Sequence, residues 1–307
     1  MLWPALRGAL KHHSSPVNRI SFRDIRLEPA PLAGWAPKVH RVLFGIFLVQ
    51  WLLVWLRLWL PRPPFGEAGW PEGLLVLLSA ATLLASLTTH LPGQNVLLSA
   101  VVIGLVSGGV MALGALTGVP FGPFAYTPAA GQQLCPGLPW AMPLVWLAAL
   151  LASRGAARLA LRPWRYNPNY GLWLIGLAAL LVATLDLGLE PFATQVKHLW
   201  KWTPTRLRLE WYTAPVVTFV AWGVTALLIL AFVTPALINK KPMRQPGPDF
   251  HPLVVWLLWN LLFATGAAVT RLWPALAVVS LTSVVVAAAG LYGAAAGPEE
   301  RGGATPR

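Results

Sequence analysis

Long runs of apolar residues, separated by short polar or charged segments, dominate the chain. Eight runs have about the 20 mostly apolar residues that a helix needs to cross a bilayer. They are residues 42–60, 73–89, 96–117, 138–161, 170–191, 212–238, 252–270 and 272–293. The pattern predicts eight membrane-spanning helices, or seven if the last two runs form one broken helix.

A chain embedded in lipid must satisfy its backbone hydrogen bonds internally, which favours helices. We therefore expect an all-α fold, a polytopic membrane helical bundle. Three parts are predicted along the chain. They are a basic cytoplasmic N-terminal arm (1–41), a transmembrane helical domain (42–293) and a disordered C-terminal tail (294–307), whose composition is rich in glycine, proline and charge.

Composition agrees with a membrane protein and excludes several other classes. Hydrophobic residues make up 56% of the 307 positions and charged residues only 11%, against roughly 25% charged in soluble domains. Lysine and arginine outnumber the acids 23 to 10, but most lie between apolar runs, which argues against nucleic-acid binding. Cys135 is the only cysteine, so an intrachain disulfide is impossible. The six histidines show no metal-ligand spacing, and we expect no metal.

Basic clusters predict how the chain is oriented. They lie in the N-terminal arm, after the fourth run (Arg154, Arg158, Arg162, Arg165) and after the sixth (Lys240, Lys241, Arg244). A cytoplasmic N-terminus places all three on the cytoplasmic side, as the positive-inside rule expects. The basic loop 192–211 falls on the other side, where its tryptophans favour a position on the membrane surface.

Asp186 and Glu190 lie one helical turn apart in an otherwise apolar run. An ionised carboxylate in hydrocarbon costs at least ~2.5 kcal/mol. The pair therefore predicts an acid that keeps its proton beside a second carboxyl group that acts as base or cation stabiliser. In the alternative, Asp186 is a packing hydrogen-bond partner and Glu190 ends the helix at the interface before Pro191.

Two further segments could form a cavity. Residues 114–126 carry no charge, and their glycines and prolines cannot continue a helix. They are interpreted as a re-entrant segment or cavity wall, or as an ordinary exposed loop. Residues 210–222 place Tyr212 and Trp222 near the start of the sixth run. These rings form an interfacial belt, or they face a cavity and stabilise a carbocation.

Other chemistries have weaker support. The chain has no Walker loop, dinucleotide fingerprint or Gly-x-Ser-x-Gly elbow. Buried acids also serve as proton relays, so a proton-coupled transporter is a third class. The sequence lacks the internal repeats that are typical of transporters.

Together, three segments resemble the integral-membrane carotenoid biosynthesis family, which includes carotenoid 1,2-hydratases and bisanhydrobacterioruberin hydratases. The similarity rests on residues 114–126, 186–191 and 211–222. It implies addition of water to the terminal C=C of an acyclic carotenoid, without a cofactor, in a bacterial or archaeal cytoplasmic membrane. The implied partners are membrane lipid, a carotenoid or related polyisoprenoid substrate and other enzymes of the pathway.

The resemblance also implies roles for residues. Asp186 would be the general acid, and Glu190 would stabilise positive charge or accept a proton from water. Substrate-binding residues would be Thr117, Phe121, Tyr126, Tyr212, Thr218 and Trp222. The chain departs from the family pattern at Met111, where similar proteins carry an acid, and at Thr218, where they carry asparagine. The alternative is a non-catalytic carotenoid- or lipid-binding protein or scaffold.

Overall fold

The computed structural model describes residues 34–60, 69–204, 209–238 and 247–296. Most of the predicted N-terminal arm, most of the predicted tail and the basic residues Lys240, Lys241 and Arg244 lie outside the described residues.

Eight α-helices form the described part of the chain, one for each predicted run. They are α1 (Ala36–Arg57), α2 (Trp70–Thr88), α3 (Gly93–Thr117), α4 (Met142–Ala160), α5 (Tyr170–Pro191), α6 (Val217–Val233), α7 (His251–Val269) and α8 (Trp273–Ala296). The predicted all-α bundle is confirmed. The last two runs are separate helices, joined by a turn in which Arg271 has φ 60°.

Among the described residues, six helices are long and apolar enough to cross a membrane: α1, α2, α3, α5 with its continuation to Val196, α7 and α8. Helix α6 has only 17 residues, and α4 carries Arg154 and Arg158. Large apolar side chains point outward from the bundle, such as Leu105 on α3, 72% exposed, and Phe232 on α6, 77% exposed. Because such surface is favourable only in lipid, the chain is a multi-pass membrane protein.

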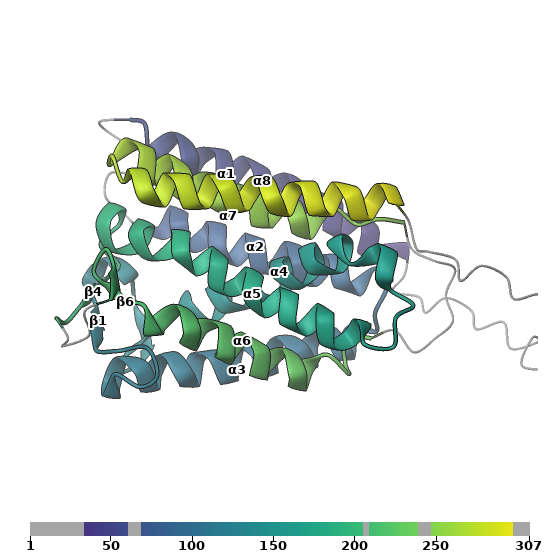
Figure 1. Ribbon diagram of the computed structural model, residues 1–307, viewed down its shortest axis with the longest axis horizontal. Coiled ribbons are helices and arrows are strands. Elements are labelled where there is room, and N and C mark those ends of the chain that lie inside the picture. Colours follow the sequence, from purple (N-terminus) through teal and green to yellow (C-terminus); the bar gives the residue numbers. More distant parts are fainter. Residues whose placement is uncertain (1–33, 61–68, 205–208, 239–246, 297–307) are drawn as a thin grey trace, which may run out of the picture.

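Helix α4 occupies the middle of the bundle. It packs against α2, α3, α5, α7 and α8, and most of its side chains are buried. Figure 1 shows α1, α7 and α8 together on one side of the bundle and α3 and α6 on the other. A central helix need not be apolar enough to face lipid, which explains why α4 tolerates arginines.

Short strands cap one end of the bundle, the end opposite the start of α1 and the end of α8 (Figure 1). Three antiparallel pairs form: β1 (Phe124–Tyr126) with β4 (Trp200–Trp202), β2 (Gln133–Cys135) with β3 (Leu138–Pro139), and β5 (Glu210–Trp211) with β6 (Ala214–Pro215). These strands could not be predicted from the sequence, because two or three residues are too few for a recognisable alternation.

The glycine- and proline-rich segment after α3 folds back over this end of the bundle. Gly118 ends α3 in the left-handed conformation, with φ 77°. The Phe121 ring packs against Gly114, where a Cβ atom would lie 2.6 Å from it. Phe121 and Phe124 are buried, so the segment is not an ordinary exposed loop.

The close approach of α8 to α4 gives a prediction about stability. A Cβ atom on Gly293 would collide with the main-chain oxygen of Leu159, whereas one on Gly176 would meet nothing within 4 Å. We expect Gly293→Ala to lower the free energy of unfolding by about 1–3 kcal/mol and Gly176→Ala to leave it unchanged or raised. Thermal unfolding in detergent would measure both, and equal melting temperatures would contradict this packing.

Candidate active site

Helix α5 continues through Pro191 because a tryptophan replaces the hydrogen bond that proline cannot make. Proline has no N–H to donate to the carbonyl four residues earlier, that of Leu187. The indole Nε1 of Trp211 donates to that carbonyl instead, at 3.0 Å. One π-helical turn, Phe192–Val196, then follows. The alternative that Glu190 ends the helix before Pro191 is therefore wrong.

Glu190 is enclosed and receives two indole hydrogen bonds. Its side chain is 2% exposed. Its Oε2 accepts from Trp200 Nε1 at 3.1 Å and from Trp202 Nε1 at 2.9 Å. Alternate residues of a strand share one side, so β4 directs both rings to the same carboxyl group. Glu190 is thus nearly as buried within the protein as Asp186, which is 0% exposed.

The expected position of loop 192–211 on the membrane surface is wrong for these tryptophans. Trp200 is 5% exposed, and the indoles of Trp200, Trp202 and Trp211 all donate to groups of α5. A buried indole N–H requires an acceptor, and α5 supplies a carboxylate and a free carbonyl. The basic Lys197 of this loop bonds to Glu72 of α2 at 2.5 Å.

Asp186 is completely buried and has no hydrogen-bond or ion-pair partner in the described part of the chain. Its exposure is 0%, and neither carboxyl oxygen has a hydrogen-bond partner among the described residues. The ion pairs of the described chain link Glu72 with Arg57 and Lys197, and Asp249 with His251. None of them includes Asp186, which is unusual because buried polar groups are normally hydrogen-bonded.

Helix α5 packs against both α4 and α6, so the heights of the two acids can be compared with that of Thr218 on α6. A Cβ atom on Gly223 of α6 would lie 3.6 Å from the Cβ atom of Ala183 of α5. Gly223 and Ala183 therefore lie at the same level along these two antiparallel helices. At 1.5 Å per residue, Thr218 lies about 7.5 Å from that level toward the strand-bearing end. Asp186 lies about 4.5 Å, and Glu190 about 10.5 Å, in the same direction. Thr218 is therefore at a depth between the two acids.

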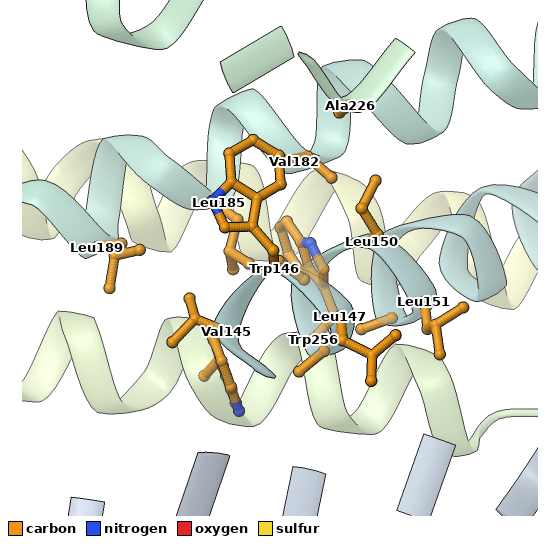
Figure 2. Packing of buried hydrophobic residues seen from close by; sticks show 14 of the residues in the cluster. Val145, Trp146, Leu147, Leu150, Leu151, Val182, Leu185, Leu189, Ala226 and Trp256 are labelled. Atoms are coloured by element: carbon orange, nitrogen blue, oxygen red, sulfur yellow. The ribbon is translucent and has the colours of Figure 1, made fainter. Parts of the chain in front are cut away.

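Further unpaired polar atoms belong to this region. Thr218 is 0% exposed, and its hydroxyl has no partner among the described residues. The Nε1 of Trp146 in α4 is also buried and unpaired there. Trp146 stacks flat on Trp222 of α6, with ring centroids 4.0 Å apart and planes 10° apart. Figure 2 shows Trp146 beside Val182 and Leu185 of α5.

Tyr126 connects the acid pair with the strand-bearing end. The β1–β4 register places it opposite Trp200, and the two rings meet edge to face at 6.1 Å. The Tyr126 hydroxyl is buried and has no partner in the described part of the chain. Burial raises the pKa of Tyr126, and the charge of Glu190 raises it further. Tyr126 therefore remains a neutral phenol that can donate one hydrogen bond.

A mostly apolar cavity of about 400 Å³ lies next to these residues. Its wall includes the aliphatic and aromatic side chains Leu75, Val145, Leu189, Trp140, Trp259 and Phe263. Glu72 and Lys197 supply charge in the same wall. Tyr126, Leu189 and Trp200 belong to the wall, whereas Asp186 and Glu190 do not. The cavity suits an apolar ligand.

The other predicted binding residues have different positions. Phe121 is buried against Gly114. Thr117 is exposed at the end of α3, and its hydroxyl bonds to main-chain atoms of its own turn. Tyr212 has φ 56°, and its hydroxyl accepts a hydrogen bond from Ala275 N of α8 at 3.2 Å. Neither Thr117 nor Tyr212 lines the apolar cavity.

Comparison with known proteins identifies the family. The chain matches the family described as "Carotenoid biosynthesis protein" over residues 72–287. The protein belongs to this carotenoid biosynthesis family. The match runs from α2 into α8 and includes the acid pair, the strands and the apolar cavity. No curated protein and no solved structure matches the chain.

Membership confirms the resemblance to a membrane carotenoid biosynthesis family that the three segments indicated. Within the described ranges, no group of three or more His, Cys, Asp or Glu side chains could hold a metal ion. The polar groups around the acid pair in this part of the carotenoid biosynthesis protein include hydroxyls and indoles, and the cavity wall adds the ion pair of Glu72 and Lys197.

Proposed function

We propose that this carotenoid biosynthesis protein adds water to the terminal C=C of an acyclic carotenoid. The observation that carries the proposal is the unequal environment of two buried carboxyl groups one turn apart. Glu190 accepts two N–H groups, and Asp186 accepts none in the described chain. An apolar cavity lies on the other side of Tyr126 and Trp200.

The hydrogen bonds support opposite roles for the two acids in the proposed reaction. An oxygen that accepts two N–H bonds is stabilised as an anion, so Glu190 is the base. An anionic Asp186 would have no donor to replace its lost water, so Asp186 is the group that carries the proton. General acid–base catalysis requires such a pair with opposite tasks.

The reaction balances without a redox cofactor. Asp186 gives its proton to the CH carbon of the terminal double bond, whose π electrons form the new C–H bond. The tertiary cation that remains accepts a lone pair of water, and the oxonium proton passes to Glu190. Transfer of that proton from Glu190 to Asp186 restores the starting state, and the net change is addition of one water.

The surrounding side chains suit a cationic intermediate. Aromatic faces attract positive charge, and the effect is larger when the site is dry. Tyr126 and Trp200 supply rings at the cavity wall. The hydroxyls of Tyr126 and Thr218 have no partner within the described ranges, so these two residues are the proposed water-positioning groups.

Expression in cells that accumulate lycopene tests the proposed function. We expect a more polar pigment whose mass exceeds that of lycopene by one water, and a second such product if both ends react. Pigment extracts analysed by liquid chromatography and mass spectrometry would show it. A pigment profile identical to that of cells without the protein would contradict the hydratase proposal.

A non-catalytic carotenoid-binding role is the second candidate. It is favoured by Met111, which is apolar and buried on α3, and by the wall that separates the acids from the cavity. Carotenoid that co-purifies in stoichiometric amount and is recovered unchanged would support this role. Carotenoid recovered with added water would support the hydratase.

The proposed orientation, with a cytoplasmic N-terminus, can be tested with the single cysteine. Cys135 is exposed on β2, at the strand-bearing end. We expect a membrane-impermeant maleimide to label Cys135 in intact spheroplasts, because that end then faces away from the cytoplasm. Labelling only after lysis would show that the protein has the opposite orientation. A Cys135→Ser protein controls for labelling of other proteins.

A further inference from the structure

A second cavity, of about 290 Å³, lies near the ends of α2 and α4 and the starts of α5 and α7. Its wall contains four arginines: Arg154, Arg158, Arg162 and Arg165. The apolar cavity is lined instead by residues from the strand-bearing end, including Tyr126 and Trp200. The arginine-lined cavity is therefore separate from the proposed site of hydration.

The four arginines are not neutralised by carboxylates. None of them forms an ion pair in the parts of the chain that the structure describes. Arg154 and Arg158 are four residues apart on α4, which puts like charges on one helical face and is unfavourable. Arg162 follows just after the end of this helix. An anion in the cavity would remove this repulsion.

Arg154 gives independent evidence for a ligand. The residue is only 5% exposed, although it carries a permanent charge. One of its guanidinium nitrogens donates to the carbonyl of Leu237 at 3.1 Å. Its Nε is buried and has no hydrogen-bond partner among the described residues. A buried guanidinium donor in the wall of a cavity requires an acceptor, which a bound anion would provide.

The other titratable groups of this wall do not supply that acceptor. The Asp249 carboxylate accepts from Ser86 Oγ at 2.9 Å and from the main chain and ring of His251. Burial alone would raise the pKa of Asp249, but these hydrogen bonds lower it overall. Burial and the nearby Arg158 lower the pKa of His90 to about 4, so His90 adds no charge at neutral pH. Tyr170 completes the polar wall.

We propose that the arginine-lined cavity binds a phosphate group. Several guanidinium forks around a small cavity match the charge and the planar hydrogen-bonding edges of a phosphate. Its source is either the headgroup of an anionic lipid or a phosphate from solution. Arginines in such a place also orient membrane proteins, but orientation alone does not require Arg154 to be buried with an unpaired donor.

Thermal unfolding of the full chain, purified in neutral detergent and freed of lipid, tests the proposal. One arm adds phosphatidylglycerol, with phosphatidylcholine as its zwitterionic control, and the other adds inorganic phosphate at constant ionic strength. We expect at least one anion to raise the melting temperature by about 5 °C, since a ligand of the folded state stabilises it. A shift with the lipid alone identifies a headgroup, and a shift with phosphate alone identifies a soluble ligand.

Two variants and a control locate the binding. Arg154→Gln removes the buried guanidinium, and Arg158→Gln removes an exposed one that makes no side-chain hydrogen bond among the described residues. Each should weaken binding roughly tenfold, as expected for loss of a charge-assisted hydrogen bond. Arg41→Gln is the control. Arg41 is exposed on α1, and its Nε donates to Pro37 O of the same helix. The melting temperature of this variant should respond to the anions like that of the unchanged protein.

Three results would overturn the proposal. The first is no shift with either anion. The second is an equal shift in the unchanged protein and in Arg158→Gln, which folds without losing a buried contact. The third is the same loss of response in Arg41→Gln, because binding would then depend on net charge and not on the cavity.

Discussion

Asp186→Asn should abolish the hydrated product while the protein remains folded. Asparagine has the size of aspartic acid but has no acidic proton, and general acid catalysis contributes about 10²–10⁴ to a rate. Product formed from lycopene should therefore fall at least a hundredfold. Chromatography of pigment extracts, normalised to the amount of protein in the membrane, would measure the loss.

Thr184→Ala is the matched control for this change. Thr184 lies on the same helix, and its hydroxyl donates only to the carbonyl of Leu181 in that helix. The control should retain activity close to that of the unchanged protein. Full activity of Asp186→Asn would show that Asp186 is not the general acid. A destabilised Asp186→Asn protein would be recognised by its lower melting temperature.

Glu190→Gln should reduce product about ten- to a hundredfold, less than Asp186→Asn. A difference in burial cannot explain the smaller loss, because Asp186 is 0% exposed and Glu190 only 2% exposed. The reason is chemical. Protonation of an alkene is the demanding step, whereas water attacks a tertiary cation readily and needs less help from a base.

The hydrogen bonds of Glu190 make this variant interpretable. The side-chain oxygen of glutamine can accept the same two indole N–H groups from Trp200 and Trp202, so the fold should be kept. The control is Glu210→Gln, which changes an exposed acid of β5 at the same end of the bundle. It should leave the amount of product unchanged. A greater loss in Glu190→Gln than in Asp186→Asn would show that the roles of acid and base are reversed.

The helices could be predicted from the sequence because each needs a long apolar run, which is a strong signal. The ends of α4 and α6 were less well predicted. Both predicted runs include residues that form short strands or turns in the structure, such as Leu138–Pro139 and Ala214–Pro215. Apolar composition alone cannot distinguish the last turn of a helix from a short buried strand.

The acid pair could be predicted, but its surroundings could not. Two carboxyl groups in an apolar run stand out in composition, whereas their partners come from distant segments. Trp200 and Trp202 were interpreted as surface anchors, although their spacing of two residues would put both indoles on one side of a strand. The pairing of β1 with β4, which brings Tyr126 to Trp200, depends on long-range contacts that no local pattern encodes.

The arginines after the fourth run show a similar limit. Counting charges gives an orientation, because the rule depends only on the number of basic residues in a loop. It does not separate an exposed arginine such as Arg158 from Arg154, which lies in α4 and is buried. Only the packing of α2, α4, α5 and α7 shows that these charges share a cavity.

Isotope labelling of the product tests the central chemical claim most directly. The reaction would be run with lycopene in membranes containing the protein, once in D₂O and once in H₂¹⁸O under ¹⁶O₂. The account predicts one deuterium bound to the carbon next to the new tertiary alcohol, and an alcohol oxygen that comes from water. A product with its oxygen from O₂, or with no deuterium on carbon, would contradict proton-initiated hydration.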